Sequence, residues 1–146
     1  MGLLDGKKGL IMGVANDHSI AWGIAQALHE QGADLGFTYV GEALERRVRP
    51  LAESLGAKLI ESCDVQRDED IEALMARVRE VYGSLDIIIH AVAFANRAEL
   101  SGPYLNTTRD GFRLALDVSA YSLTGVVKAA QDVLAPGASI VTMTYH

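Results

Sequence analysis

Residues 8–31 read KGLIMGVANDHSIAWGIAQALHEQ and contain three patterns in succession. Residues 9–12 are an apolar run that predicts a buried strand, residues 13–18 predict a loop, and residues 19–28 have the apolar spacing of a helix. In an open parallel sheet, such a turn places the first N–H groups of a helix at the carboxyl edge of a strand, where they bind a pyrophosphate without a charged side chain. The stretch therefore suggests a phosphate-binding turn.

The spacing of this turn departs from the common G-x-G-x-x-G pattern. Only Gly13 and Gly23 flank it, and Ser19 stands where a second glycine is expected. A serine hydroxyl at a helix start either caps a free N–H or bonds a phosphate oxygen. The turn by itself therefore has two interpretations, a phosphate-binding turn and an ordinary glycine turn whose serine caps the helix.

Composition narrows the class of protein. The 146 residues are 49% hydrophobic, which suits one globular domain with a sizeable core. A net charge of -6, from 13 Lys and Arg against 19 Asp and Glu, disfavours nucleic-acid binding. Cys63 is the only cysteine, so we expect a buried structural thiol and no metal site. No signal-peptide core or membrane-length apolar run is found in the sequence, which favours a cytoplasmic protein without membrane association.

The rest of the chain repeats the alternation of strand and helix. We expect strands at residues 34–40, 58–63, 85–91 and 139–144, the last leading to Tyr145 and His146, and helices over residues 44–55, from a cap at Asp68 to Gly83, and from a cap at Thr107 or Thr108 to about Leu134. Pro50 predicts a kink in the second helix or a start near Arg49, and residues 136–137 (Pro-Gly) should end the last helix region.

Five strands alternating with four helices predict an α/β fold, a doubly wound parallel sheet of the Rossmann-like type with strand order 3-2-1-4-5. Residues 1–146 then form a single domain of the dinucleotide-binding type. The three consecutive isoleucines at residues 87–89 indicate a strand covered on both faces.

The last predicted helix is apolar on nearly all sides between residues 112 and 127. One face would cover the sheet, and the opposite face needs another partner. We favour a subunit interface, the alternative being burial by a part of the protein outside these residues.

The predicted sheet places a ligand crevice between the carboxyl ends of the first and fourth strands. Asp64 is placed to accept a hydrogen bond from an adenine amino group, with Val65 supplying a backbone N–H, although an aspartate at this position also suits a turn. The second strand ends in Val40, followed by Glu42, with no Arg or Lys immediately there for a 2′-phosphate. This favours NAD over NADP.

Five segments of the chain carry a resemblance to a known family. They read GVANDHSIAWG at 13–23, CDV at 63–65, HAVAFA at 90–95, DVSAYS at 117–122 and TMTY at 142–145. In this order and spacing they resemble the bacterial NADH-dependent enoyl-acyl-carrier-protein reductases, a divergent branch of the short-chain dehydrogenase/reductases. The resemblance implies hydride transfer from NADH to a trans-2-enoyl thioester on acyl carrier protein in fatty-acid elongation, by a homotetramer.

The resemblance also implies roles for individual residues. Tyr145 matches the first of two active-site tyrosines and would donate a hydrogen bond to the thioester oxygen, on which negative charge develops. The backbone of Ala95 would contact the acyl substrate. NAD would be held by seven residues: Gly13, Ser19 and Ile20 at the pyrophosphate, Val40 at the adenosine ribose, Asp64 and Val65 at the adenine, and Val92 near the nicotinamide.

Three functional hypotheses remain. The first is the reductase, and the second is a truncated, catalytically inactive dinucleotide-binding module. The third, a ketoacyl reductase, is disfavoured because Ser19 and residues 90–92 (His-Ala-Val) replace that group's glycine-rich turn and Asn-Ala-Gly segment. By the resemblance, the family's second tyrosine and its lysine form a Tyr-x6-Lys unit on the helix after the fifth strand, beyond His146. That unit and the later strands are absent from these residues, so residues 1–146 are expected to be a single NAD-binding domain truncated at its C-terminus, with no appreciable turnover by this chain alone. His18 and His90 have no evident carboxylate partner and are expected to be structural.

Overall fold

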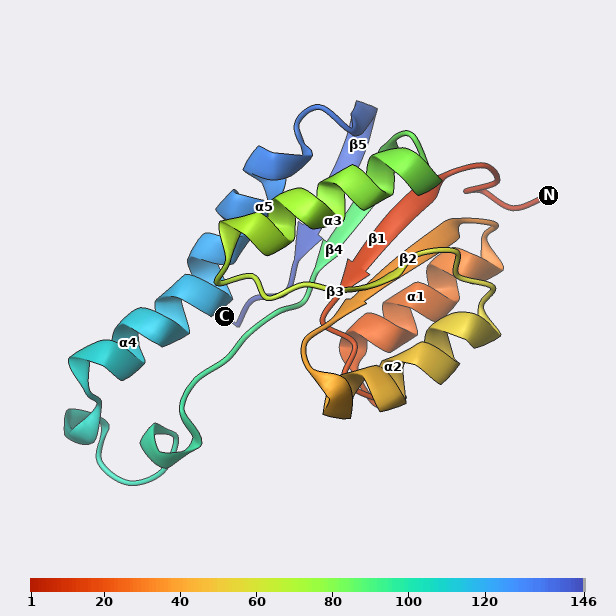
Figure 1. The fold of residues 1–146 in the computed structure, drawn as a ribbon. Helices are drawn as coiled ribbons and strands as arrows, with labels where there is room; N and C mark the ends of the chain where they lie inside the picture. Colours follow the sequence, from red (N-terminus) through yellow and green to blue (C-terminus); the bar gives the residue numbers. More distant parts are fainter. Residues whose placement is uncertain (146) are drawn as a thin grey trace.

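A parallel five-stranded sheet forms the centre of the computed structural model, which describes residues 1–145 (Figure 1). Its strands lie in the spatial order β3 (Ile60–Ser62), β2 (Asp34–Tyr39), β1 (Lys8–Met12), β4 (Leu85–His90) and β5 (Leu134–Thr142). Every neighbouring pair is parallel. The α/β class, the doubly wound Rossmann-like sheet and the order 3-2-1-4-5 are therefore confirmed.

Helices cover both faces of this sheet. Figure 1 shows α1 (Ile20–Glu30) and α2 (Glu42–Ser54) on one side and α3 (Asp68–Val81) and α5 (Ser122–Ala130) on the other. Because side chains alternate along a strand, Ile87 and Ile89 enter the core under α1 and α2, and Ile88 enters the core under α3 and α5. The isoleucine run therefore marks a strand buried on both faces, as predicted.

The starts of α2 and α3 differ from the predictions. α2 begins at Glu42 and continues through Pro50, so a start near Arg49 is wrong. Pro50 is exposed, so the carbonyl it leaves without an N–H partner can bond water, while Val48 and Ala52 hold the helix to the sheet. Asp68 is the first residue of α3 rather than its cap, which is Arg67.

The predicted last helix consists of three pieces: α4 (Arg109–Leu116), a π-helical turn η3 (Asp117–Tyr121), and α5. Thr108 is its cap, accepting a hydrogen bond from the Gly111 N–H at 3.0 Å, and Thr107 is not. The helix ends at Ala130 rather than near Leu134, which belongs to β5.

Strand β5 begins earlier and ends sooner than predicted. Residues 136–137 lie inside it instead of ending a helix, because the pairing of β4 with β5 shifts between Leu85 and Ile87 and accommodates the extra residues as an irregularity. The strand ends at Thr142, and His146 lies outside the described residues.

An arm leaves the sheet after β4. Its loop contains two short 3-10 turns, η1 (Arg97–Glu99) and η2 (Tyr104–Asn106), and returns through α4, extending well beyond the sheet in Figure 1. The Glu99 carboxylate closes the loop by accepting the Thr108 N–H at 2.7 Å and the Thr108 hydroxyl at 2.6 Å. These hydrogen bonds lower the pKa of Glu99. Several large apolar side chains of the arm are exposed, among them Leu100, Tyr104, Leu105, Phe112 and Leu116.

Candidate functional site

A cleft of about 540 Å³ opens at the carboxyl edge of the sheet. Its walls come from the residues that follow β1, β2, β3 and β4, together with Leu114 and Val118. This is the crevice position predicted from the topology, where β1 and β4 lie side by side and their helices lie on opposite faces. Five of the predicted site residues line the cleft: Gly13, Val40, Asp64, Val65 and Val92.

Gly13 is required at the mouth of the cleft by the backbone itself. Its φ is +110°, in the region that favours glycine, and a Cβ there would overlap the carbonyl oxygen of Ala91. The close approach is fixed by the Ala91 N–H, which donates to the Met12 carbonyl at 2.9 Å. A side chain at this position would therefore force the backbone after β1 away from Ala91, which follows β4.

The Ser19 side chain forms hydrogen bonds to the loop between β1 and α1 and not to the helix. Its Oγ accepts hydrogen bonds from the N–H groups of Ala15 at 2.9 Å and Asn16 at 3.1 Å, and makes no bond to an N–H of α1. A side-chain cap on the helix is therefore wrong. The hydroxyl proton remains available to donate. The N–H groups of Trp22 and Gly23 donate to the Ser19 carbonyl, whereas those of Ile20 and Ala21 have no partner within the helix. Ser19 and Ile20 lie outside the lining of the cleft, and the Ile20 side chain is exposed.

Asp64 both forms a turn and lines the cleft. Its Oδ1 accepts the Gln66 N–H at 3.0 Å, the two-residue bond of an Asx turn, and its own N–H donates to Asp70 at 3.0 Å. Oδ2 takes part in neither bond, so the turn leaves one carboxylate oxygen for a ligand. Asp64 is also the only charged side chain among the described residues that line the cleft.

Cys63 lines the same end of the cleft as a buried free thiol. Burial raises the pKa of this thiol to about 12, so it stays protonated and unreactive near neutral pH. The expectation of a buried thiol is confirmed.

The opposite end of the cleft is built by β4, the arm and η3. Val92 and Phe94 line it, and the Phe94 N–H donates to Ser119 Oγ at 3.0 Å while the Ser119 hydroxyl donates to the Phe94 carbonyl at 3.2 Å. Sequence reasoning assigned no role to Ser119 or Val118, although both belong to the DVSAYS segment on which the resemblance rests. Their position within that segment was the one feature of the sequence that could have marked them as site residues.

Two predicted substrate-side residues do not line the cleft. Ala95 is half-buried in the arm loop, and Tyr145 is fully exposed after the end of β5. Because the Tyr145 side chain is completely exposed, no residue of the described chain packs against its ring. The structure therefore brings five of the seven residues predicted to bind the cofactor to one cleft, whereas Ser19, Ile20, Ala95 and Tyr145 lie outside its lining.

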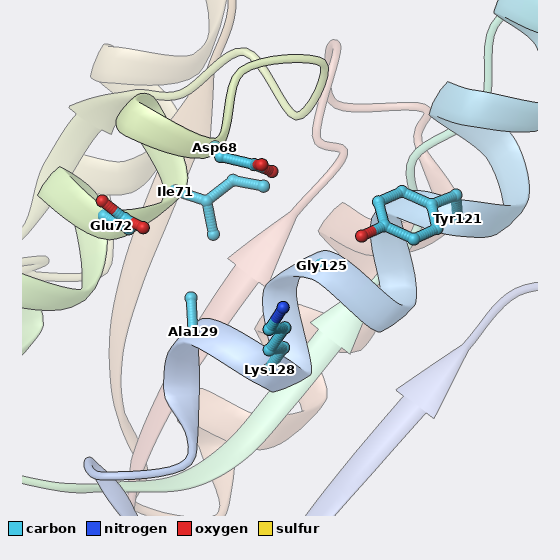
Figure 2. A pocket seen from close by; sticks show the side chains of 7 residues that line it. All are labelled: Asp68, Ile71, Glu72, Tyr121, Gly125, Lys128 and Ala129. Carbon is cyan, nitrogen blue, oxygen red and sulfur yellow. The ribbon is translucent and has the colours of Figure 1, made fainter.

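A second hollow, of about 190 Å³, lies between α3 and the helix formed by η3 and α5. Figure 2 shows the hydroxyl of Tyr121 and the ammonium of Lys128 pointing toward it, with Asp68 and Ile71 on the other side. None of the predicted site residues lines it. A Cβ on Gly125 would make only ordinary contacts with Ile71 and Tyr121, so the packing of this chain does not require glycine here.

Within residues 1–145, no helix has the length and apolar character needed to cross a membrane. The same part of the chain contains no group of three or more His, Cys, Asp or Glu side chains arranged to hold a metal ion.

Comparison with known proteins adds a family and several relatives. A family model described as enoyl-(acyl carrier protein) reductase matches residues 13–146. The FabI enoyl-acyl-carrier-protein reductase (NADH) of Bacillus subtilis is 54% identical over 144 residues, which cover 97% of this chain and 56% of the relative. The chain thus spans about half the length of the curated relatives it matches.

Two solved structures show the same fold at high similarity. The Bacillus cereus enoyl-acyl carrier protein reductase, crystallised with NADP+ and an indole naphthyridinone, superposes with a TM-score of 0.94 at 48% identity, covering 99% of this chain and 57% of that one. The Anaplasma phagocytophilum reductase in complex with NAD gives a TM-score of 0.92 at 45% identity, with 99% and 56% covered.

Proposed function

Because the chain belongs to the enoyl-(acyl carrier protein) reductase family, we propose that it forms the NAD-binding domain of an enzyme that reduces trans-2-enoyl-acyl-carrier-protein to acyl-acyl-carrier-protein in fatty-acid elongation. The observation that carries this proposal is the cleft between β1 and β4, where Gly13, Asp64 and Val92 meet at the carboxyl edge. The names of the relatives support both the reaction class and the cofactor, because they specify an enoyl-acyl-carrier-protein reductase that uses NADH.

The residues of the cleft suit a dinucleotide whose phosphates are held by backbone N–H groups. Gly13 opens the phosphate turn, Ser19 and Ile20 lie at the start of the helix beside it, and Val40 follows the end of β2 at the adenosine ribose. Asp64 offers its remaining carboxylate oxygen to the adenine amino group. Since no described lining residue carries a positive charge to bind a 2′-phosphate, we assign the site to NAD rather than NADP.

When bound, NADH supplies the hydride for the β-carbon of the enoyl thioester. The roles that fall to this chain are to orient the nicotinamide near Val92, to contact the acyl group through the backbone of Ala95, and to donate a hydrogen bond from Tyr145 to the thioester oxygen. Tyr145 stands outside the cleft, so its role requires the segment after Thr142 to turn inward.

The enzyme's proposed partners are the acyl carrier protein that presents the substrate and further copies of the chain in a cytoplasmic homotetramer. Exposed apolar residues on the arm support an interface between copies. This assignment concerns whole subunits and is tested by the mass of the particle in solution.

A second candidate function is a dinucleotide-binding module without catalysis. The position of Tyr145 outside the cleft favours it for the 146-residue chain, whose one Tyr-x6-Lys spacing, Tyr121 to Lys128, precedes Tyr145 and lies at the hollow between α3 and α5 instead of in the cleft. We therefore expect binding of NADH without appreciable turnover when an enoyl thioester is added to this chain alone. Thioester-dependent oxidation of NADH would contradict that expectation.

The test of the binding site is a titration of the 146-residue chain with NADH, followed by the fluorescence of Trp22, its single tryptophan. Asp64→Asn keeps the oxygen that accepts the Gln66 N–H but removes the carboxylate, so we expect affinity to fall about fivefold to tenfold. Asp132→Asn, an exposed position away from the cleft, should leave affinity unchanged. Absence of saturable binding to the parent chain would overturn the proposal.

A further inference from the structure

The imidazole of His90 joins three segments at the carboxyl edge of the sheet. His90 is the last residue of β4 and only 1% of it is exposed. Its Nδ1 lies 2.9 Å from Oγ1 of Thr142, the last residue of β5. Its Nε2 lies 2.7 Å from Oγ of Ser122, the first residue of α5, whose side chain is completely buried. The three side chains form one hydrogen-bonded polar group, buried at His90 and Ser122 and exposed at Thr142, called here the His90 group.

One distribution of protons satisfies every member of the His90 group. The Ser122 hydroxyl donates to the carbonyl of Val118 at 2.6 Å, so its oxygen is the acceptor for the Nε2–H of His90. Nδ1 of the neutral ring then accepts from the hydroxyl of Thr142. Burial lowers the pKa of His90 and keeps the ring neutral near pH 7.

The His90 group reaches both walls at one end of the cleft. On one side it ends at Val118 in η3, which lines the cleft, and the next residue, Ser119, holds the backbone of Phe94. On the other side Thr142 precedes Tyr145 by three residues, and the Met143 N–H donates to the His90 carbonyl at 3.1 Å. A change at His90 is therefore transmitted to the segments that carry Phe94 and Tyr145.

The chemistry of the group argues for a role in placement rather than in stability. A buried polar side chain gains little net stability from its hydrogen bonds, because folding exchanges bonds to water for bonds to protein. An apolar side chain of similar size fills such a site without needing partners, whereas a fully bonded group specifies one arrangement of its segments. The hydrogen bonds of Asp64, at the other end of the cleft, involve none of the three side chains.

We propose that His90 is a positioning residue for the nicotinamide half of the dinucleotide, acting through Ser122 and Thr142, and that the adenosine half binds independently of it. This inference rests on the proposed function, which assigns the nicotinamide to the Val92 end of the cleft. His90 does not touch the ligand. It holds η3 and the end of β5 in the arrangement that the nicotinamide meets.

The experiment compares the affinity of the 146-residue chain for NADH with that for ADP-ribose, which has the adenosine and both phosphates but no nicotinamide. The parent chain should prefer NADH. Each of three variants, His90→Asn, Ser122→Ala and Thr142→Val, should reduce this preference about tenfold with little change in ADP-ribose affinity. The matched controls His29→Asn and Thr124→Val alter exposed helix positions and should preserve the preference.

The outcomes separate this inference from the proposed function. If the parent chain binds neither ligand, the proposed function is overturned and the role of His90 with it. If the parent binds both equally, or if the variants lose affinity for both in the same proportion, NAD binding stands and the positioning role is overturned. Should His90→Asn fail to fold, Thr142→Val decides the matter, because it alters only an exposed position at the end of β5.

Discussion

The two ends of the cleft are built in different ways. At the adenosine end, the side-chain hydrogen bonds join residues close in sequence. The Ser19 hydroxyl accepts from the N–H groups of Ala15 and Asn16, and the Asp64 carboxylate accepts from the N–H of Gln66. At the nicotinamide end, the bonds join distant segments. His90 and Thr142 are 52 positions apart, and Phe94 and Ser119 are 25 apart.

This difference separates local stability from long-range assembly. Turns made of neighbouring residues form wherever their strand and helix form, because little chain entropy is lost in closing them. The other end depends on β5, which is exposed along most of its length and pairs on one side only. The adenosine end should therefore tolerate changes in β5 and the arm, whereas the nicotinamide end should not.

The strongest test of this contrast is Gly13→Ala, at the point where the two ends meet. The change places a Cβ against Ala91 and forces a positive φ on a residue that disfavours it, so we expect unfolding to become easier by about 3 kcal/mol. Urea denaturation followed by Trp22 fluorescence measures it. The control Gly23→Ala lies in the exposed surface of α1 with no neighbour near the new Cβ and should gain up to about 1 kcal/mol. Equal stability of the two variants would refute the close approach of β1 and β4.

A smaller effect is expected in the arm. Thr108→Ala removes the acceptor for the Gly111 N–H and should destabilise α4 by about 1 kcal/mol. Amide hydrogen exchange at Gly111 and Phe112 should become faster while exchange at Ala15 stays the same. Thr107→Ala, beside the cap, is the matched control. Faster exchange at Ala15 as well would show that the two regions are coupled.

The smallest effect is a pH dependence confined to the arm. The bonds from Thr108 lower the pKa of Glu99 from its ordinary value of 4.5, so they stabilise the folded arm fully above that pH. The contribution is lost as pH falls through the lowered pKa. The amide NMR signal of Thr108 should report this step, and Glu99→Gln should abolish it while Glu69→Gln does not. The amides of Ala15 and Asn16 bond a serine hydroxyl, which does not titrate in this range, so their signals should not follow the same step.

The contrast between local and long-range contacts also explains which features could be predicted from the sequence. The strands, their order and the crevice follow from local apolar periods and from the handedness of crossovers, and Gly13, Asp64 and Val92 were placed correctly along the edge. The cap on α4 also follows from a local pattern, although its choice between Thr107 and Thr108 needed the structure.

The remaining features depend on contacts that sequence spacing does not encode. The π-helical turn at residues 117–121 breaks a continuous apolar pattern, and its bonds run to Phe94 in the arm and through Ser122 to His90. Residues 136–137 read as a helix end, yet pairing with β4 absorbs them into a strand. Tyr145 was placed by resemblance at the active site, and nothing in the described chain holds it there.

The most direct test of the account maps NADH onto the 146-residue chain by its amide NMR shifts. We predict that the amides of residues 13–20, Val40, residues 63–65 and Val92 move together with one affinity, since residues 13–15, Val40, 63–65 and Val92 line one crevice and residues 16–20 lead from it into α1. Shifts clustered instead around Gly125 and Lys128, at the hollow between α3 and α5, or no shifts at all, would contradict the claim that the cleft between β1 and β4 is the dinucleotide site.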